Sequence, residues 1–219
     1  MEIETYAIRH AKSRPGTLLP ETLRTIDSLP ENARILDIGC AEGYTIEWLR
    51  NEFPDRFELI GVDLSKIRIQ KAKEKGILGA TFYEGDATDL PIDDVYVDFV
   101  IASQVIEHVP DDDKVIREVE RVLALGGSFQ IDTVLKRKWA FYFYRSPSGW
   151  ALDPTHLREY TDIDSLRAKF PTSLKIADIK YVKSFRRINL IPFLSFLPDS
   201  ARIRIPGYFT IFLSGEKVR

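Results

Sequence analysis

The 219-residue chain contains one cysteine, Cys40, so it cannot form an intrachain disulfide. It has no run of 18 or more apolar residues, which is the length that a membrane-spanning helix requires. Its first 16 residues, MEIETYAIRHAKSRPG, lack the apolar core of a secretory signal. These absences predict a cytoplasmic protein that is stabilised by a buried apolar core rather than by cross-links. The length suits one α/β domain better than two.

Two common nucleotide-binding motifs are also missing. The segment ILDIGCAEGYT (35–45) has an apolar run followed by two glycines, Gly39 and Gly43. A dinucleotide fingerprint requires G-x-G-x-x-G, but this chain has Ala41 and Tyr44 at the second and third glycine positions. A P-loop requires Lys-Ser/Thr after its last glycine, and none follows Gly43. NAD binding and ATP hydrolysis are therefore disfavoured, and we expect a glycine turn for a ligand without a pyrophosphate.

Charge is unevenly distributed along the chain, although the net charge is only −2. Residues 1–130 carry 15 Lys and Arg against 25 Asp and Glu, whereas residues 131–219 carry 16 against 8. The basic C-terminal part either meets an anionic molecule or is simply a solvated basic surface.

Apolar runs alternate with segments of helical periodicity over the first 134 residues. Strands are expected at 34–38, 57–63, 80–86, 97–103 and 128–134, and helices at 45–53, 65–76 and 111–127. Ser65 is the expected N-cap of the second helix. This alternation with short loops is typical of a doubly wound parallel sheet, which binds ligands at the carboxyl ends of its strands.

The pattern becomes less regular after residue 134. Residues 135–161 are rich in aromatic residues and arginine, and 162–170 has the pattern of a helix capped by Thr161 or Asp162. Two more strands are expected at 174–185 and 208–216. The stretch between them is apolar and broken by prolines, which predicts a loop or a short helical insert.

Five segments together resemble the class I S-adenosylmethionine-dependent methyltransferases, specifically the small-molecule "type 11" subfamily. They are ILDIGCAEG, IGVDLS, EGDATDLPI, VDFVIASQVIEHVPD and LALGGSFQI, in the order of the family and over residues 33–133. The resemblance implies a Rossmann-like seven-stranded sheet, mostly parallel with an antiparallel C-terminal hairpin, plus a small cap or insert. It also implies one domain over 1–219, divided into an N-terminal helical lid (1–30), a cofactor-binding core (31–134) and an acceptor-side cap with the last strands (135–219).

The resemblance assigns S-adenosyl-L-methionine as the cofactor, a molecule with an adenosine, an amino-acid tail and a sulfonium but no phosphate. Asp37 and the backbone around Gly39 and Gly43 are expected to hold the ammonium end. Asp63 is expected to accept the ribose hydroxyls, and Leu64 to pack on the adenine. Asp37 is otherwise a cap for the next helix, and Asp63 otherwise a favourable charge at a helix N-terminus.

The remaining cofactor contacts are expected after the third and fourth strands. Asp86 accepts the adenine amine in this interpretation, and the Ala87 backbone meets the ring edge. Ser103 and Gln104 face the methionine portion. Asp86 is otherwise an ordinary turn residue. Cys40 is expected to be a small packing residue, because methyl transfer from a sulfonium requires no protein nucleophile.

Histidines are the candidate bases, and the chain has only three. His108 and His156 are predicted as catalytic residues for a hydroxyl acceptor, or else as histidines satisfied in packing. His10 is assigned to the lid. The sequence Gln104-x-x-Glu107-His108 is similar to the Glu-x-x-Glu-His site of methyltransferases that use a divalent ion. Because Gln104 replaces the first carboxylate, no metal is predicted.

The acceptor is expected against residues 135–161. From this segment we predict five acceptor-binding residues: Tyr142, Arg145, Trp150, Arg158 and Tyr160. The arginines suit a phosphate or carboxylate. The aromatic residues form a stacking wall in this interpretation, and the core of a small cap in the alternative.

The predicted function is methyl transfer to a small or medium-sized acceptor, with an O-methyltransferase acting on an anionic or lipid-linked molecule favoured. One alternative is an RNA methyltransferase, because basic and aromatic residues stack on single-stranded bases. Another is a non-catalytic cofactor-binding protein that docks on a membrane or partner through LIPFLSFLP (190–198) and its flanking arginines. A nicotinamide dehydrogenase is disfavoured by the missing glycines.

Overall fold

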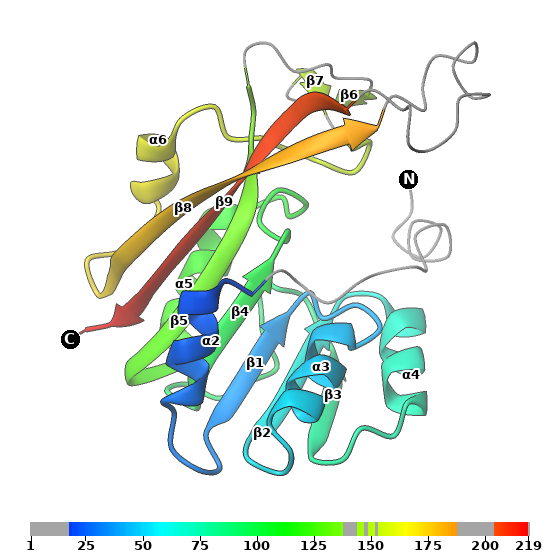
Figure 1. Ribbon diagram of the computed structural model, residues 1–219, viewed down its shortest axis with the longest axis vertical. Coiled ribbons are helices and arrows are strands. Elements are labelled where there is room, and N and C mark those ends of the chain that lie inside the picture. The colour runs from blue at the N-terminus through cyan, green and yellow to red at the C-terminus, as the bar shows by residue number, and fades with distance from the viewer. Residues whose placement is uncertain (1–17, 138–143, 147–148, 152, 188–203, 219) are drawn as a thin grey trace.

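A seven-stranded mixed sheet forms the centre of the molecule (Figure 1). The computed structural model describes residues 18–137, 144–146, 149–151, 153–187 and 204–218. The strand order is β3-β2-β1-β4-β5-β9-β8, with parallel pairing from β3 to β5 and antiparallel pairing of β9 with both β5 and β8. The sheet strands are β1 (Arg34–Ile38), β2 (Glu58–Asp63), β3 (Ala80–Glu84), β4 (Val97–Ser103), β5 (Leu123–Leu135), β8 (Leu174–Arg187) and β9 (Arg204–Lys217). The predicted fold class is confirmed.

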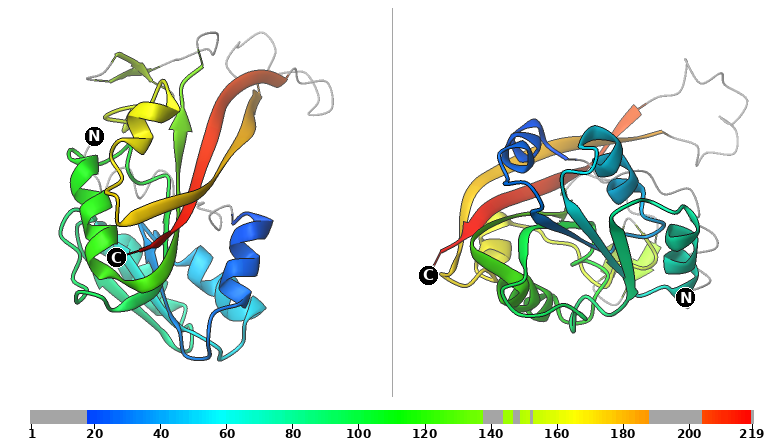
Figure 2. Two further views of the ribbon diagram at one scale, coloured as in Figure 1. Left: turned by 90° about the vertical axis from the view of Figure 1, so that its left-hand side faces the viewer. Right: turned by 90° about the horizontal axis from the view of Figure 1, so that it is seen from below.

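Helices cover both faces of the sheet (Figure 2). On one face lie α2 (Pro20–Asp27), α3 (Tyr44–Glu52) and α4 (Lys66–Glu74), and on the other lie α5 (Asp112–Val122) and α6 (Ile163–Arg167). Two separate clusters of buried side chains fill these layers, one including Ile46 and Leu49 of α3 and the other including Val115 and Val119 of α5. The sheet is therefore apolar on both faces, as parallel sheets generally are.

Side-chain caps fix the starts of the helices. The Ser65 hydroxyl accepts a hydrogen bond from the Arg68 backbone N–H, which confirms the predicted N-cap of α4. Asp111 caps α5 through the Lys114 N–H, and Asp162 caps α6 through the Ser165 N–H. Each cap satisfies a backbone donor that the first turn leaves without a partner.

The boundary between α5 and β5 differs from the prediction. The helix predicted over 111–127 ends at Val122, and Leu123 already has extended backbone. Leu123 is buried and pairs with Val97 of β4, and Gly126 adopts a φ of +77°. Residues 123–127, whose periodicity resembles a helix, therefore belong to β5, which is 13 residues long.

The last two strands are longer than predicted. β8 continues to Arg187 and β9 begins at Arg204, so both ends of the predicted loop or helical insert are strand. Residues 188–203, with the LIPFLSFLP segment, lie outside the described residues, as does His10. A separate two-stranded sheet joins β6 (Tyr144–Ser146) to β7 (Gly149–Ala151).

Within the predicted N-terminal lid, only α2 and the residues flanking it are described. The Thr22 hydroxyl of α2 donates to the Gln130 side chain of β5 at 2.6 Å, and Lys180 of β8 pairs with Glu21. These contacts fix α2 over the middle of the sheet, and the lid role of residues 1–30 stays a prediction. None of the helices in the described ranges is long and apolar enough to cross a membrane.

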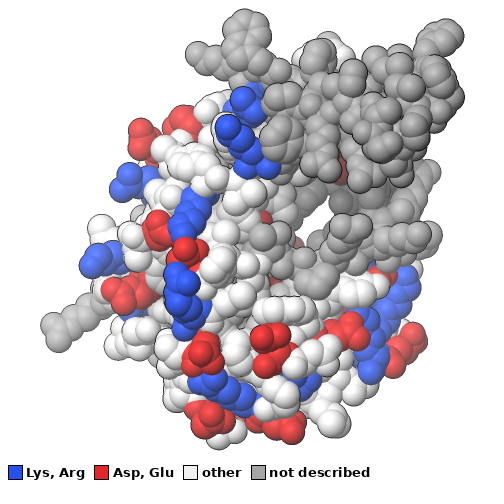
Figure 3. Space-filling view, viewed as in Figure 1, with Lys and Arg blue, Asp and Glu red and all other residues white. Residues whose placement is uncertain are grey.

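Charged side chains on the face seen in Figure 3 alternate in sign over the described residues. Lys75 pairs with Glu47 and Arg56 pairs with Asp27, for example. Neither sign gathers into a patch among the described side chains of this face. The predicted anionic partner of the C-terminal part therefore gains no support here and stays a prediction.

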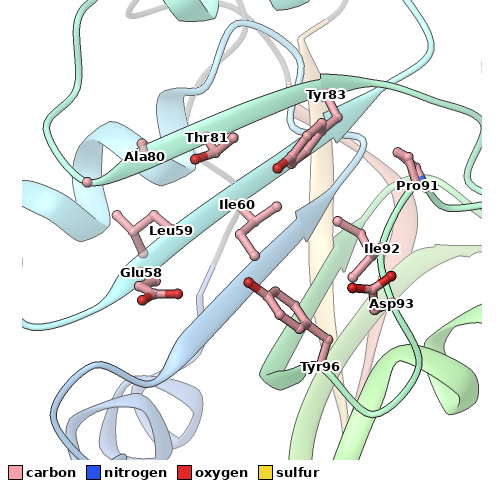
Figure 4. Close-up of a pocket in the computed structure, with 11 residues that line it drawn as sticks. Glu58, Leu59, Ile60, Ala80, Thr81, Tyr83, Pro91, Ile92, Asp93 and Tyr96 are labelled. Atoms are coloured by element: carbon pink, nitrogen blue, oxygen red, sulfur yellow. The ribbon is translucent and has the colours of Figure 1, made fainter.

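The connection from β3 to β4, residues 85–96, contains no helix. It lies beside the face of β2 and β3, and a surface cavity opens between them, lined by residues that include Ile60, Tyr83, Ile92 and Tyr96 (Figure 4). None of the predicted cofactor-binding residues lines this cavity. It is therefore separate from the site that the sequence predicts.

A single arginine of α5 holds this connection in place. The Arg121 guanidinium donates to the carbonyl oxygens of Leu90 and Ile92 at 3.1 and 2.7 Å, and it also binds Glu118 and Asp94. The Glu118 carboxylate in turn accepts from the Leu90 N–H at 2.7 Å.

We expect Arg121→Met to lower the free energy of unfolding by about 1–3 kcal/mol. The carbonyl oxygens of Leu90 and Ile92 and the Glu118 carboxylate would lose their hydrogen-bond donor. Methionine keeps most of the aliphatic stem. Urea unfolding measures the change, with Arg117→Met, an exposed arginine of the same helix, as the control. Equal stability of the two variants would contradict the proposed role of Arg121.

Candidate functional site

The predicted cofactor residues converge at one edge of the sheet. β1, β2 and β4 run parallel, so their carboxyl ends meet at the same edge (Figure 1). Asp37 of β1 is in register with Gly61 of β2 and Ile101 of β4, and Ser103 of β4 is in register with Asp132 of β5. Asp63 closes β2 at the same level. Residues 64 positions apart in sequence, such as Asp37 and Ile101, are thus neighbours in the sheet.

The turn after β1 requires glycine for conformation and for space. Gly39 and Gly43 each adopt a φ of +72°, a region that favours glycine. A Cβ on Gly39 would lie 2.6 Å from Val105 Cγ2, and one on Gly43 would lie 2.9 Å from the Phe82 ring. The turn therefore packs directly against side chains that follow β4 and lie in β3.

Most backbone donors of this turn are used within the protein. The N–H groups of Gly39 and Cys40 donate to the Val62 carbonyl oxygen at 2.8 and 3.0 Å, and the Gly43 N–H donates to the Cys40 carbonyl oxygen at 2.9 Å. A phosphate-binding loop instead points such donors at its ligand. The geometry thus agrees with the sequence-based exclusion of a pyrophosphate.

Asp63 is held by the backbone on both sides. Its Oδ2 accepts from the Ala41 N–H at 2.9 Å and its Oδ1 accepts from the Ser65 N–H at 2.8 Å. Each carboxylate oxygen has two lone pairs, so a fixed Asp63 retains acceptor capacity toward a ligand. Leu64 beside it is 49% exposed, so its side chain is accessible to a ligand at this edge.

Three carboxyl groups are buried near this edge, at Asp37, Glu107 and Asp132. Each has one oxygen without a hydrogen-bond partner: Asp37 Oδ2, Glu107 Oε1 and Asp132 Oδ2. Burial raises the pKa of Asp37 to about 8, and the charges of Asp63 and Asp132 add to the rise. Burial also raises the pKa of Glu107 and of Asp132 to about 7. Such a cluster favours a cationic ligand, which would stabilise the ionised forms.

Sequence reasoning missed Asp132. It lies in β5, and its Oδ1 accepts from the Gln104 side-chain amide at 2.9 Å, while its backbone carbonyl accepts from the Gln104 N–H. Gln104 itself has a φ of +55°. The available signal was an aspartate inside the apolar strand pattern FQIDTV, which matches the position of Asp37 in ILDI.

The residues after β3 adopt a local turn. Asp86 is exposed, and its Oδ1 accepts from both the N–H and the hydroxyl of Thr88 at 2.8 Å. Ala87 is partly buried and packs against the core. These contacts neither use nor block Asp86 Oδ2, so the predicted adenine contacts of Asp86 and Ala87 stay predictions.

The two predicted bases lie side by side. The rings of His108 and His156 are edge to face, with centroids 4.8 Å apart. Burial and the neighbouring His156 lower the pKa of His108 to about 4, so this imidazole is neutral at neutral pH and only weakly basic. The structure brings these residues together, whereas their catalytic role stays a prediction.

Two of the predicted acceptor-binding residues, Arg158 and Tyr160, make hydrogen bonds within the protein. The Arg158 guanidinium donates to the carbonyl oxygens of Ile106, Val109 and Pro110, and the buried Tyr160 hydroxyl donates to Asp112. Both contacts attach the segment 153–160 to α5 and the residues before it. Trp150 is exposed in β7.

The two other predicted acceptor-binding residues are Arg145 and Tyr142. Arg145 is placed by its backbone in β6, and Tyr142 lies outside the described residues. Roles in acceptor binding therefore stay predictions for all five residues.

We expect Asp37→Asn to flatten the pH dependence of stability in the ligand-free protein. With its raised pKa, folded Asp37 keeps a proton between about pH 4 and 8 that the unfolded chain releases. The free energy of unfolding of the wild type therefore falls as pH rises through this window. The variant should gain on the order of 1–3 kcal/mol relative to the wild type between pH 5 and 8.5.

Urea unfolding across this pH range measures the slope. Asp93→Asn, which changes an exposed aspartate of the β3–β4 connection, is the matched control and should keep the wild-type slope. A slope in Asp37→Asn equal to that of the wild type would show that Asp37 ionises normally.

Known proteins are similar to this chain in sequence. The chain is 31% identical over 174 residues to 2-methyl-6-phytyl-1,4-hydroquinone methyltransferase 2, chloroplastic, of Oryza sativa subsp. japonica, an alignment that covers 78% of this chain and 49% of that protein. The chain thus spans about half the length of this curated relative.

Solved structures confirm the fold. The YcgJ protein from Bacillus subtilis matches with a TM-score of 0.68 and 22% identity, covering 91% of this chain and 97% of that one. The [4+2]-cyclase SpnF matches with a TM-score of 0.61 and 23% identity, covering 87% of this chain and 77% of that one. At these identities the likeness concerns the fold alone.

The model of the methyltransferase domain family matches residues 36–131. This range begins in β1, ends in β5 and includes the glycine turn, Asp63 and the ends of β3 and β4. Over this region the chain matches the methyltransferase domain family, and the resemblance to S-adenosylmethionine-dependent methyltransferases is confirmed.

Proposed function

We propose that this protein transfers a methyl group from S-adenosyl-L-methionine to a small or medium-sized acceptor. The observation that carries the proposal is the pair of buried carboxyl groups, Asp37 near the end of β1 and Asp132 in β5 level with the end of β4, each with an unsatisfied oxygen. They lie beside a turn whose donors are mostly used internally. A ligand with positive charge and no phosphate suits both features, and S-adenosylmethionine has this chemistry.

The residues at the strand ends fit the parts of this cofactor. In the proposal Asp37 holds the ammonium group, and the backbone-fixed Asp63 accepts the ribose hydroxyls. The exposed Leu64 covers the adenine, whose edge meets Asp86 and Ala87. Ser103 and Gln104 face the methionine portion. When bound, the cofactor supplies an electrophilic methyl carbon, so the chain itself must align the acceptor and exclude water.

We favour an acceptor of small or medium size that takes the methyl group on an oxygen atom. The rice relative is named for 2-methyl-6-phytyl-1,4-hydroquinone without stating the methylated atom, whereas tocopherol O-methyltransferase of Arabidopsis thaliana, 32% identical over 105 residues, is named for transfer to oxygen. In the proposal the acceptor lies against β6, β7 and the residues around them, where Tyr142, Arg145 and Trp150 are the predicted contacts. In the proposal His108 and His156, which lie side by side after β4 and before α6, are the candidate bases for the hydroxyl proton.

Other reactions on the same fold are the main competing candidates. The cyclase SpnF has the same fold, so the fold alone does not fix the reaction. The RNA alternative gains no support from the described part of the face in Figure 3, where the two signs of charge alternate. Docking through LIPFLSFLP concerns residues outside the described ranges.

We expect calorimetric titration to show micromolar binding of S-adenosylmethionine and S-adenosylhomocysteine and no binding of NAD. Asp63→Asn should weaken binding by roughly 10–100-fold, because each lost charge-assisted hydrogen bond contributes about 1.5–3 kcal/mol. Asp93→Asn is the control. Absence of adenosyl binding in the folded wild type would overturn the proposal, whereas binding without methyl transfer to any acceptor in a screen would favour the non-catalytic alternative.

Cofactor affinity should rise with pH between about 6 and 8.5. The raised pKa values of Asp37 and Asp132 mean that these groups are partly protonated in the free protein, and a cationic ligand requires their ionised forms. Binding should therefore release protons, which appears as a dependence of the calorimetric enthalpy on the ionisation enthalpy of the buffer. An enthalpy that is equal in all buffers at pH 7 would contradict this assignment.

A further inference from the structure

The residues after β4 and the segment before α6 bring together three side chains that suit a metal ion. Glu107, His108 and His156 each offer one ligand atom, and these atoms lie within 4.8 Å of one another. The Leu157 N–H donates to the Glu107 carbonyl oxygen at 2.9 Å, so the backbone itself fixes the two segments against each other. We propose that these three residues bind a divalent first-row transition-metal ion.

Glu107 is the first argument for a cation at this place. Its side chain is fully buried, and its Oε2 accepts from the Thr133 hydroxyl at 2.9 Å. Its Oε1 has no hydrogen-bond partner. A buried carboxylate oxygen without a donor is costly, and a coordinated cation would offset that cost.

The hydrogen bonds of the two histidines indicate which ring nitrogen would coordinate an ion. The Thr155 hydroxyl donates to Asp153 at 2.5 Å, so its oxygen, 3.0 Å from His108 Nδ1, accepts the Nδ1 proton. His156 Nδ1 lies 2.7 Å from Glu159 Oε1 and donates to it. In both rings the remaining lone pair is then on Nε2. A carboxylate partner such as Glu159 is typical behind a metal-bound histidine, and so is a backbone carbonyl oxygen, which Thr155 places 3.4 Å from His108 Nδ1.

The third ligand is what the sequence motif could not reveal. Gln104-x-x-Glu107-His108 lacks one carboxylate, and the Gln104 amide is directed to Asp132 instead. His156, 48 positions after His108, completes the set. Two imidazoles and one carboxylate with open positions suit Fe²⁺, Mn²⁺, Co²⁺, Ni²⁺ or Zn²⁺ better than Mg²⁺ or Ca²⁺, which prefer oxygen ligands.

A second group of acidic residues, Asp111, Asp112 and Asp113, is already neutralised by protein partners. Asp112 accepts from the Tyr160 hydroxyl and pairs with Lys169 at 3.1 Å, and Lys169 also pairs with Asp113. Asp111 caps α5. We therefore propose no metal site at these residues and use Asp113 as the control position.

The ion could bind whether or not the protein transfers a methyl group. Its role toward the acceptor, however, rests on the proposed function. Glu107 is bound to Thr133, the neighbour of Asp132, so the ion would adjoin the carboxylates assigned to the cofactor. Its open positions would then take an oxygen of the acceptor and lower the pKa of that hydroxyl.

The test is titration of chelator-treated wild-type protein with Co²⁺, Zn²⁺ and Mg²⁺, without cofactor or acceptor. We expect one equivalent of Co²⁺ and of Zn²⁺ to bind at micromolar concentration, Mg²⁺ to bind far more weakly, and visible absorption of bound Co²⁺ to report nitrogen and oxygen ligands. His156→Ala and Glu107→Gln should lower Co²⁺ affinity by at least roughly 100-fold, and Glu159→Gln by about 10-fold or more. Asp113→Asn should bind as the wild type does.

S-adenosylhomocysteine binding by each variant is measured in parallel and shows whether its fold and cofactor site are intact. No binding of Co²⁺ or Zn²⁺ to the wild type at millimolar metal would overturn the metal site, and so would loss of binding in Asp113→Asn alone. If Co²⁺ binds while S-adenosylhomocysteine does not, the metal site stands and the proposed function fails. The reverse result removes the metal and leaves the proposed function in place.

Discussion

Unpaired carboxyl oxygens buried at the carboxyl edge of the sheet are the constraint on which the account of this protein depends. Asp37 and Asp132 come from β1 and β5, on either side of β4, and both are nearly inaccessible to solvent. Burying an ionised carboxylate without a partner is costly, so the ligand-free protein holds protons there at neutral pH. A cationic ligand removes this cost, so binding of such a ligand should stabilise the folded protein.

The same constraint recurs at Glu107, four residues after the end of β4. Glu107 is buried, bound on one side by Thr133 and unpaired on the other, and two histidines with fixed tautomers lie next to it. The edge of the sheet thus contains two adjoining places that favour positive charge. In the proposed reaction one holds the methyl donor and the other holds the acceptor, a division that would bring both reactants to the ends of β4 and β5.

The sequence predicts the parts of this site that are local. Gly39, Gly43 and Asp63 follow strands whose apolar runs are plain, and the parallel sheet brings their ends together whatever the side chains are. The Ser65 cap is equally local. The α5–β5 boundary cannot be predicted from local sequence. Whether Leu123 continues a helix or pairs with Val97 depends on the neighbouring strand.

The tertiary partners were likewise hidden from the sequence. Three features depend on contacts between segments that are distant in sequence. Gln104 donates to Asp132, Arg158 donates to three carbonyl oxygens, and His156 lies beside Glu107. A motif that lacks one carboxylate therefore predicted no metal, although the fold supplies an imidazole near the same place.

The central claim is that this edge recognises the positive charge of its ligand. Calorimetric comparison of S-adenosylhomocysteine with its analogue lacking the α-amino group, at pH 7.5, tests it most directly. The account predicts that removing the amine weakens binding by roughly 100-fold or more, as expected when a buried carboxylate loses its charged partner. Equal affinity for the two compounds would contradict the account, because the buried carboxyl groups would then play no part in binding the ligand.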